Sequence, residues 1–352
     1  QCAVDYGFHM MLTNCDAETV ADVDQLMGRG VTSFKLYTAY TGTLYSPDDV
    51  ILRMLQHSRS TGALMMLHAE NGPAIDVLRE QAVEAGQLAP RYHAQTRPAA
   101  LEAEAVHRVT RLAEVAGAPI YIVHLSSAEG LSEVVRARAR GVRALAETCP
   151  QYLLLEDSVY DKPDFEGAAY VMSPPIRPKG HQEPLWAALA SGSLQVVATD
   201  HCPFNQVGQK DMGKGDFRKI PNGAAGIEHR MSLMYTYGVL TGRLTLQQFV
   251  DVTSTRAAKI FGLYPRKGSI SVGADADIVV WDPAASKTIS VKTHHQNIDY
   301  NIFEGMEVTG WPVKVLLRGD LVMEKGVPVL GKGRGRYLPR KRSNLINGET
   351  SL

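Results

Sequence analysis

The sequence has 352 residues, of which 45% are hydrophobic and 21% charged, so it can bury a large core and is not a disordered chain. Its 37 Lys and Arg residues balance its 37 Asp and Glu residues, which removes the electrostatic case for nucleic acid or an anionic membrane as main partner. The four cysteines are not closely spaced in the sequence, so they indicate neither a disulfide framework nor a cysteine-rich zinc site. No apolar run reaches the ~20 residues of a membrane span, and we expect a cytoplasmic globular protein with reduced thiols.

The chain starts at Gln1, without Met and inside an apolar stretch that is typical of a strand. Domains seldom begin in the middle of a strand, so we expect a natural N-terminal part to precede this sequence.

Short apolar runs alternate with longer segments of helical periodicity, which predicts βαβ units and a parallel sheet. Strands are expected at Ala3–Met10, Val31–Tyr37, Ala63–His68, Ile120–His124, Val142–Glu147 and Gln195–Thr199. Helices are expected at Ala17–Gly28, Pro47–Ser60, Gly72–Ala85, Ala99–Ala116, Ser127–Arg140, Glu183–Ala190, Gly226–Tyr237 and Thr245–Phe261. Ser126 and Glu129 form an expected capping box ahead of the fifth helix.

Six parallel strands fit two architectures. An open doubly wound sheet would carry a glycine-rich phosphate loop after its first strand, and the sequence has none there. We therefore predict an α/β fold in the form of a (β/α)₈ TIM barrel whose first two βα units are absent from this sequence.

After Gly262 the pattern changes to short strands separated by Gly, Pro and Asp turns, which predicts a small β-sandwich. These strands are expected at Gly268–Gly273, Ala276–Trp281, Val313–Arg318, Leu321–Glu324 and Val327–Leu330. The predicted organisation is a partial hydrolase barrel over residues 1–262, a partial β-sandwich over 263–335 and a C-terminal tail over 336–352.

Four predicted strands each deliver one ionisable side chain at or near the C-terminal end: Lys35, His68, His124 and Asp200. In a closed parallel barrel these ends meet on one face, where active sites are built. Taken singly, a strand-end histidine is equally compatible with a hydrogen-bonded core residue, and Asp200 with a loop cap. Lys35 is harder to dismiss, because burying an unpaired amine costs several kcal/mol.

Together the four side chains indicate a metal site. Two imidazoles and a carboxylate suit Zn²⁺. A protonated lysine amine is a poor ligand, but its reaction with CO₂ to a carbamate turns it into a bridging, carboxylate-like ligand.

Six segments in order along the chain closely resemble the D-hydantoinase/dihydropyrimidinase branch of the amidohydrolase superfamily. They are Ser33-Phe-Lys-Leu-Tyr-Thr-Ala-Tyr40, His68-Ala-Glu-Asn71, His124-Leu-Ser-Ser127, Met172-Ser-Pro-Pro-Ile-Arg177, Thr199-Asp-His-Cys-Pro-Phe204 and Ile220-Pro-Asn-Gly-Ala-Ala-Gly-Ile-Glu228. The resemblance runs from Cys2 to about Gly335 and implies a (β/α)₈ barrel with a β-sandwich. It also implies hydrolysis of the cyclic amide of hydantoins or dihydropyrimidines to N-carbamoyl amino acids by a hydroxide bridging two zinc ions.

The resemblance further implies roles for seven residues. Lys35 would be the N6-carboxylysine that bridges two zinc ions per subunit; His68 and His124 would ligate one zinc and Asp200 the other. Asp200 would also be the general base that returns its proton to the leaving nitrogen.

The other three of these seven residues would contact the substrate. Tyr40 would donate to the oxyanion, while Ser173 and Asn222 would hold the ring amide, largely through backbone groups. From the residues alone, packing in an aromatic cluster explains Tyr40 and a turn role explains Ser173 and Asn222.

The sequence departs from the family at one point, because family members carry a His-x-His pair after the first strand and none occurs here. We interpret this, with the missing barrel units and sandwich strands, as ~100 residues absent from the N-terminal side. A protein truly lacking them is expected to hold no tight binuclear centre and to show little activity.

Two other functions are compatible with the same architecture. One is a related hydrolase, allantoinase or dihydroorotase. The other is a non-catalytic scaffold like the collapsin response mediator proteins, which lack the ligand set. The expected partner is a small cyclic amide, with no nucleic acid and no membrane, and family relatives are commonly homotetramers.

Overall fold

The computed structural model describes residues 2–329 and 331–342. Its larger part is a six-stranded parallel sheet whose strands follow one another in sequence order, β1-β2-β3-β4-β5-β6. The strands are β1 (Met10–Met11), β2 (Ser33–Tyr37), β3 (Leu64–His68), β4 (Ile120–Ile122), β5 (Ala144–Thr148) and β6 (Val196–Val197). A connection through a helix separates each strand from the next, which is the βαβ pattern that the sequence predicts.

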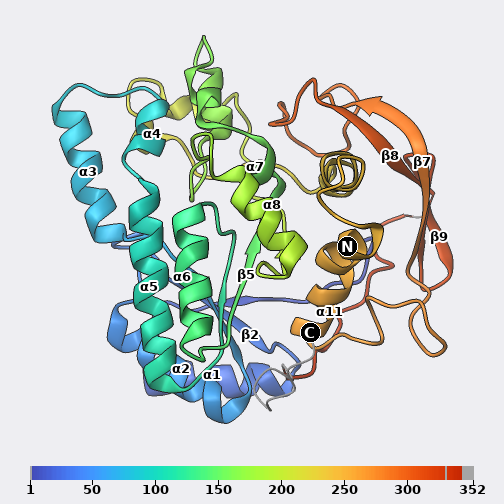
Figure 1. Ribbon diagram of the computed structural model, residues 1–352, viewed down its shortest axis with the longest axis horizontal. Coiled ribbons are helices and arrows are strands. Elements are labelled where there is room, and N and C mark those ends of the chain that lie inside the picture. Colours follow the sequence, from blue (N-terminus) through green and yellow to red (C-terminus); the bar gives the residue numbers. More distant parts are fainter. Residues whose placement is uncertain (1, 330, 343–352) are drawn as a thin grey trace.

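Helices lie outside this sheet (Figure 1). The α-helices are α1 (Ala17–Gly28), α2 (Asp48–Thr61), α3 (Gly72–Glu84), α4 (Arg91–Gln95), α5 (Ala99–Ala116), α6 (Ala128–Ala139), α7 (Pro150–Leu154), α8 (Gln182–Ser191), α9 (Arg230–Met234), α10 (Leu246–Val250) and α11 (Arg256–Ile260). The 3₁₀ helices are η1 (Asp157–Asp161), η2 (Glu166–Tyr170), η3 (Lys210–Gly213) and η4 (Phe217–Lys219); the π-helices are η5 (Tyr235–Val239) and η6 (Asp251–Thr255). None of the helices in the described ranges is long and apolar enough to cross a membrane.

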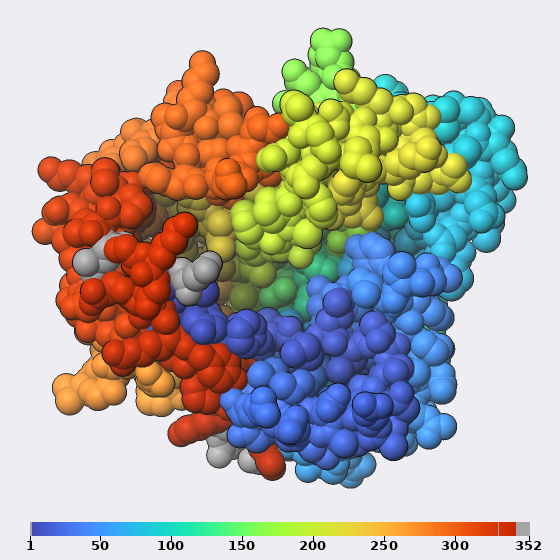
Figure 2. Space-filling model, turned by 180° about the vertical axis from the view of Figure 1, so that it is seen from behind, coloured from blue at the N-terminus to red at the C-terminus, as the bar shows by residue number. Residues whose placement is uncertain are grey.

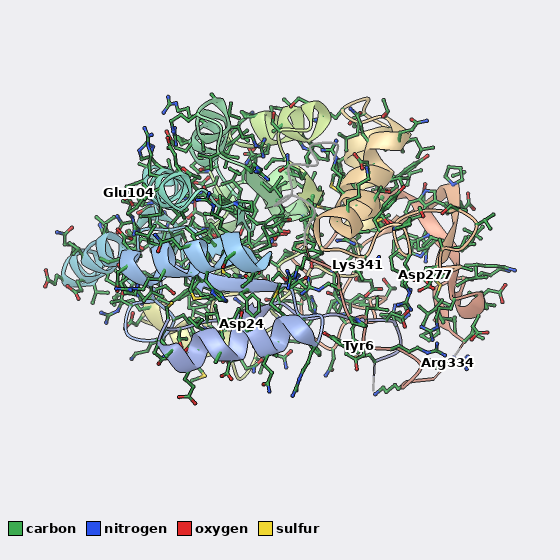
Figure 3. The ribbon with its side chains drawn as sticks, turned by 90° about the horizontal axis from the view of Figure 1, so that it is seen from below. Tyr6, Asp24, Glu104, Asp277, Arg334 and Lys341 are labelled. Atoms are coloured by element: carbon green, nitrogen blue, oxygen red, sulfur yellow. The ribbon has the colours of Figure 1, made fainter. Side chains whose placement is uncertain are left out.

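A second, four-stranded antiparallel sheet follows in the order β10-β9-β8-β7. Its strands are β7 (Ile278–Thr288), β8 (Glu307–Leu317), β9 (Asp320–Glu324) and β10 (Val327–Pro328). Figure 1 shows β7, β8 and β9 on the opposite side of the molecule from α1, α2, α5 and α6. In Figure 3, correspondingly, Glu104 of α5 lies far from Asp277 and Arg334.

The N-terminal segment lies against a segment near the other end of the described chain, as the adjoining blue and red surfaces in Figure 2 show. Tyr6 donates its N–H to the carbonyl of Arg336 at 3.0 Å, and Leu338 donates to the carbonyl of Tyr6 at 2.8 Å. Asp5 accepts a hydrogen bond from Lys267 at 2.8 Å and also contacts Arg318. These bonds tie the first residues to the region around the antiparallel sheet.

The two faces of the parallel sheet have different surroundings. The outer face packs against the helices in the main hydrophobic core, which contains Phe34, Leu36, Met65, Leu67, Ile120 and Ile122. The inner face holds a smaller cluster that includes Leu64, Met66, Tyr121, Val123 and Leu145. Because side chains alternate along a strand, the inner face is also where the polar residues of β2 and β3 lie.

Three expectations about local structure are wrong. The first strand covers only Met10–Met11, because residues 3–9 are mostly exposed and bond to residues near 336–340. Gly268–Gly273 forms bends and one turn rather than a strand.

The third concerns Ser126. The N-cap of α6 is Ser127, whose side chain accepts from the N–H of Gly130 at 3.0 Å. Ser126 instead donates to the buried carboxylate of Glu102 at 2.9 Å, so a tertiary hydrogen bond replaces the capping box. Leu330, the last residue of the fifth strand expected in the β module, lies outside the described residues, as does the tail from residue 343 onward.

Candidate active site

Two neighbouring strands supply the first side chains of the site. In β2, Phe34 and Leu36 are fully buried on the outer face, so Lys35 and Tyr37 alternate to the inner face. The parallel register pairs Tyr37 with His68, the last residue of β3. The rings of these two residues stack with centroids 5.8 Å apart, so the end of each strand presents a polar side chain at the same edge.

The imidazole of His124 meets that of His68. The Nδ1 atom of His68 lies 3.0 Å from the Nε2 atom of His124, and both side chains are buried. On its other side, His68 donates from Nε2 to the carboxylate of Glu70 at 2.8 Å. In the tautomer with its proton on Nε2, where Glu70 accepts it, the Nδ1 lone pair of His68 faces His124.

Burial dominates the protonation of this pair. It lowers the pKa of His124 well below the usual value, and the charges of His68 and Lys35 act in the same direction. The Nδ1 atom of His124 is buried without a hydrogen-bond partner in the protein. His124 is therefore a neutral imidazole, which is the form that binds a metal ion.

Three further ionisable groups surround the histidines. Burial raises the pKa of Glu147, at the end of β5, to about 7, although the Tyr121 hydroxyl donates to this carboxylate at 2.7 Å and Lys35 is nearby. Burial also raises the pKa of Asp200, and it outweighs the opposite influence of Lys35 and His68. The Lys35 amine lies 5.0 Å from the centre of the Tyr37 ring. Lys35, His68, His124, Glu147 and Asp200 thus form one electrostatically coupled group.

The backbone is unusual at three of the predicted site residues. Tyr40, His124 and Asp200 have φ angles of 65°, 39° and 48°, in the left-handed region that residues other than glycine seldom adopt. Such conformations cost ~1–3 kcal/mol each and concentrate at functional sites. His124 follows the end of β4 by two residues, and Asp200 follows the end of β6 by three.

The donor set can be tested for its fit to a metal ion. Within residues 2–329 and 331–342, no three His, Cys, Asp or Glu side chains form a ready cage. The two imidazole nitrogens do converge: two ligands of a tetrahedral zinc at Zn–N distances of ~2.0–2.1 Å lie about 3.3 Å apart, close to the 3.0 Å between them. The pair fits one metal ion, with Lys35 and Asp200 in its electrostatic surroundings.

The three predicted substrate contacts line one cavity of about 190 Å³. Tyr40, Ser173 and Asn222 form part of its wall together with Glu70 and Arg97. The Tyr40 ring lies 5.1 Å from that of His68, measured between centroids, so the cavity adjoins the histidine pair. The Ser173 hydroxyl oxygen is buried without a partner.

Backbone hydrogen bonds fix the loops that carry these residues. The N–H of Gly223 donates to the carbonyl of Val171 at 3.0 Å, which joins the Asn222 loop to the Ser173 loop. On its other side, the N–H of Cys202 donates to Ala224 at 3.0 Å, which joins the Asn222 loop to the segment after Asp200. A Cβ on Gly223, whose φ is +142°, would lie 2.5 Å from the Cys202 carbonyl oxygen, so this approach requires glycine.

Sequence reasoning missed several neighbours of the site. Glu147 ends the strand expected at Val142–Glu147 and is the last residue but one of β5, so the same strand-end rule indicates it. Glu70 lies two residues after His68, within the quoted motif, and its position there is the only signal. Arg97 lies between α4 and α5 and reaches the cavity through tertiary packing, where its Nη1 donates to His93 Nδ1 at 3.1 Å. No local pattern marks it.

The sequence of this chain is similar to those of known proteins. A family model described as Amidohydrolase family matches residues 17–322. A D-hydantoinase of Streptomyces coelicolor is 51% identical over 339 residues, which cover 96% of this chain and 72% of the relative. A D-hydantoinase of Geobacillus stearothermophilus is 48% identical over 353 residues, 100% of this chain and 75% of the relative.

Solved structures of relatives have the same fold. A D-hydantoinase from a Bacillus sp. AR9 superposes with a TM-score of 0.95 at 47% identity, covering 97% of this chain and 74% of that one. A dihydropyrimidinase from Brevibacillus agri NCHU1002 gives a TM-score of 0.95 at 46% identity over the same shares of the two chains. These similarities confirm the predicted combination of a parallel β/α barrel and a small antiparallel sheet.

Proposed function

The chain belongs to the amidohydrolase family, in its D-hydantoinase and dihydropyrimidinase branch, and from this premise we propose that it hydrolyses the cyclic amide bond of hydantoins or dihydropyrimidines. The products would be N-carbamoyl amino acids. The observation that carries this proposal is the buried pair of imidazole nitrogens 3.0 Å apart, beside a cavity lined by Tyr40, Ser173 and Asn222.

His68 and His124 would hold a divalent metal through Nδ1 and Nε2, and we propose zinc. Lys35, as a carbamate, and Asp200 would complete the ligands that this chain offers to two ions. When bound, the metal supplies a hydroxide at neutral pH and polarises the carbonyl that is attacked. Glu70 would keep the His68 proton on Nε2, so that Nδ1 is free as a ligand.

Asp200 would move the proton. A ring amide nitrogen is a poor leaving group until it is protonated, so hydrolysis needs a base that accepts the proton of the attacking water and returns it to the nitrogen. The carboxylate of Asp200 lies in the group of charges around Lys35 and His68, which supports this role.

Tyr40 would donate its hydroxyl proton to the oxyanion that forms when the carbonyl is attacked. Burial raises the pKa of this phenol, so the group keeps its proton as a hydrogen-bond donor. The backbones at Ser173 and Asn222 would hold the ring amide on the other wall of the cavity. The homotetramer stays a prediction from the resemblance, and the cytoplasmic location stays a prediction from the cysteines and the lack of a long apolar run in the sequence.

The test is an assay with zinc and bicarbonate on a 5-substituted hydantoin, dihydrouracil, allantoin and dihydroorotate. Since the sequence contains no His-x-His pair, it is run on the chain as printed and on the chain joined to the N-terminal segment of the S. coelicolor relative. We expect turnover of the hydantoin or dihydrouracil, lowered more than about 100-fold by Lys35→Ala and unchanged by Lys162→Ala, a change at an exposed lysine.

Two outcomes would contradict the proposal. Turnover of allantoin or dihydroorotate alone would assign a different ring. An active Lys35→Ala variant with wild-type turnover would remove the lysine-bridged mechanism.

A further inference from the structure

Lys210 is a fully buried lysine outside the proposed metal site. It opens the 3₁₀ helix η3, and its side chain has no exposed surface. Its amine donates to the carbonyl oxygens of Val171, at 2.9 Å, and Pro221, at 3.0 Å. The two acceptors belong to segments 50 residues apart in the sequence.

Both acceptors lie next to a predicted substrate contact. Val171 precedes Ser173 by two residues, and Pro221 directly precedes Asn222. The Val171 carbonyl also accepts from the N–H of Gly223 at 3.0 Å. The amine of Lys210 thus joins the two loops that form one wall of the cavity by donating a hydrogen bond to each.

The helix that carries Lys210 is itself fixed against the Asn222 loop. A Cβ on Gly213, the last residue of η3, would lie 2.7 Å from the backbone nitrogen of Ile220, so the two backbones are in close contact. The N–H of Lys210 donates to the carbonyl of Asn205 at 2.9 Å. Because its own backbone is held in place, Lys210 can keep the two carbonyl groups at a fixed distance from each other.

A lysine at this buried position lowers the stability of the fold, because its charge loses contact with water. Within the described ranges it forms no ion pair with a carboxylate, and the titratable groups near its amine are the Cys202 thiol and the His93 imidazole. Burial lowers the pKa of the amine to about 7, against a smaller influence of Cys202. A methionine of similar length would fill the space without the desolvation cost, so packing alone does not explain the amine.

The second carbonyl of the same loop is held in a comparable way. His93 donates from Nε2 to the carbonyl of Met172 at 2.8 Å, and its Nδ1 accepts from Arg97. Consecutive carbonyls just before Ser173 are therefore held by buried side chains from different elements.

We propose that Lys210 is a positioning residue that sets the distance between the Ser173 and Asn222 backbones and so determines how tightly the ring amide binds. This inference rests on the proposed function, in which those backbones hold the substrate. It predicts an effect mainly on substrate binding, since the amine lies outside the groups that move protons or hold metal.

The test compares Lys210→Met, Lys210→Arg and Lys214→Met. Lys214, four residues further on, is exposed and serves as the matched control. Hydrogen exchange by mass spectrometry on the printed chain follows the peptides that contain residues 171–174 and 220–224. Steady-state kinetics on the active form of the assay above give KM and kcat separately.

We expect Lys210→Met to speed exchange in both peptides, to raise KM about tenfold and to change kcat less than about threefold. Lys210→Arg, which keeps donors for the two carbonyls, should recover most of the KM, and Lys214→Met should match wild type. Wild-type exchange or wild-type KM in Lys210→Met would overturn the proposal.

The kinetic and exchange readouts also separate this inference from the proposed function. A wild-type protein that hydrolyses no cyclic amide would remove the proposed function and, with it, the substrate role of Lys210. Turnover by wild type together with an unchanged KM in Lys210→Met would remove only the inference. If circular dichroism shows that Lys210→Met is unfolded, Lys210→Arg decides the test. An exchange rate and a KM far from wild type in Lys210→Arg would then contradict the positioning role of Lys210.

Discussion

The Nδ1 atom of His68 and the Nε2 atom of His124 face each other at 3.0 Å in a buried position at the ends of neighbouring strands. A hydrogen bond at this distance requires a proton on one of the two nitrogens, and a metal ion bound to both nitrogens would take the place of that proton. Since Glu70 holds the other nitrogen of His68, the pair has the directed lone pairs and the outer carboxylate of a metal site.

Glu70→Gln is expected to weaken zinc binding ~10–100-fold, because an amide is a weaker acceptor for the His68 proton than a carboxylate. Competition with a chromophoric chelator measures the affinity. Glu84→Gln, at an exposed position of α3, should bind zinc like wild type. Equal affinities in Glu70→Gln and Glu84→Gln would show that the carboxylate does not support a metal ligand.

Zinc itself should stabilise the fold. A ligand that binds only the native state at ~100 times its Kd adds about 2.7 kcal/mol to the free energy of unfolding. We expect the thermal midpoint of wild type to rise with zinc and to fall back when a chelator is added. The zinc-dependent rise should be lost in His124→Asn and kept in His107→Asn, whose histidine is half exposed on α5. A rise of the same size in both variants would place the bound zinc elsewhere.

Tyr40→Phe is expected to lower kcat for the cyclic amide ~10²–10³-fold with a smaller change in KM, because removing an oxyanion donor acts on the transition state. Tyr45→Phe, in the same loop but outside the cavity lining, is the control. A loss confined to KM would assign Tyr40 to substrate packing instead.

The buried amine of Lys210 makes a prediction for pH. Its pKa is about 7 in the folded protein and 10.5 as the ordinary value, so between these pH values the unfolded chain binds a proton that the folded chain does not. Stability from this group therefore rises as the pH increases from about 7 to 10.5, and below pH 7 the full penalty of the buried charge is present.

Thermal midpoints of wild type and Lys210→Met measure this effect across the same pH range. The thermal midpoint of wild type should rise relative to that of the variant as the pH rises, by about 1.4 °C for each kcal/mol of penalty removed. The charge of His93 is absent throughout, because burial keeps its pKa well below the usual value. A constant difference between the two proteins from pH 7 to 10.5 would contradict the assigned protonation.

Strand-end logic allowed much of the site to be predicted from the sequence. His68 is the last residue of β3 and Lys35 lies in the middle of β2, two residues before its end, and the C-terminal ends of the strands converge in any parallel barrel. Helices with strong periodicity and clear ends, such as α1 and α5, were predicted with the bounds that the structure has.

Long-range contacts account for what the sequence could not reveal. Nothing local in Ala3–Met10 indicates that its hydrogen bonds go to residues near 336–340, so the apolar stretch predicts a strand that the structure does not form there. Ser126 looks like a cap until its bond to Glu102 is seen. Lys210 is an ordinary lysine in the sequence, and only the fold brings Val171 and Pro221 to its amine.

The most direct test is a crystal structure of the chain grown with zinc and bicarbonate, with diffraction recorded on both sides of the zinc absorption edge. The account predicts an anomalous peak bonded to both His68 Nδ1 and His124 Nε2, at ~2.0–2.1 Å from each, and carboxylate density on the Lys35 amine. Two imidazoles still bonded directly to each other at saturating zinc, next to an unmodified lysine, would contradict it.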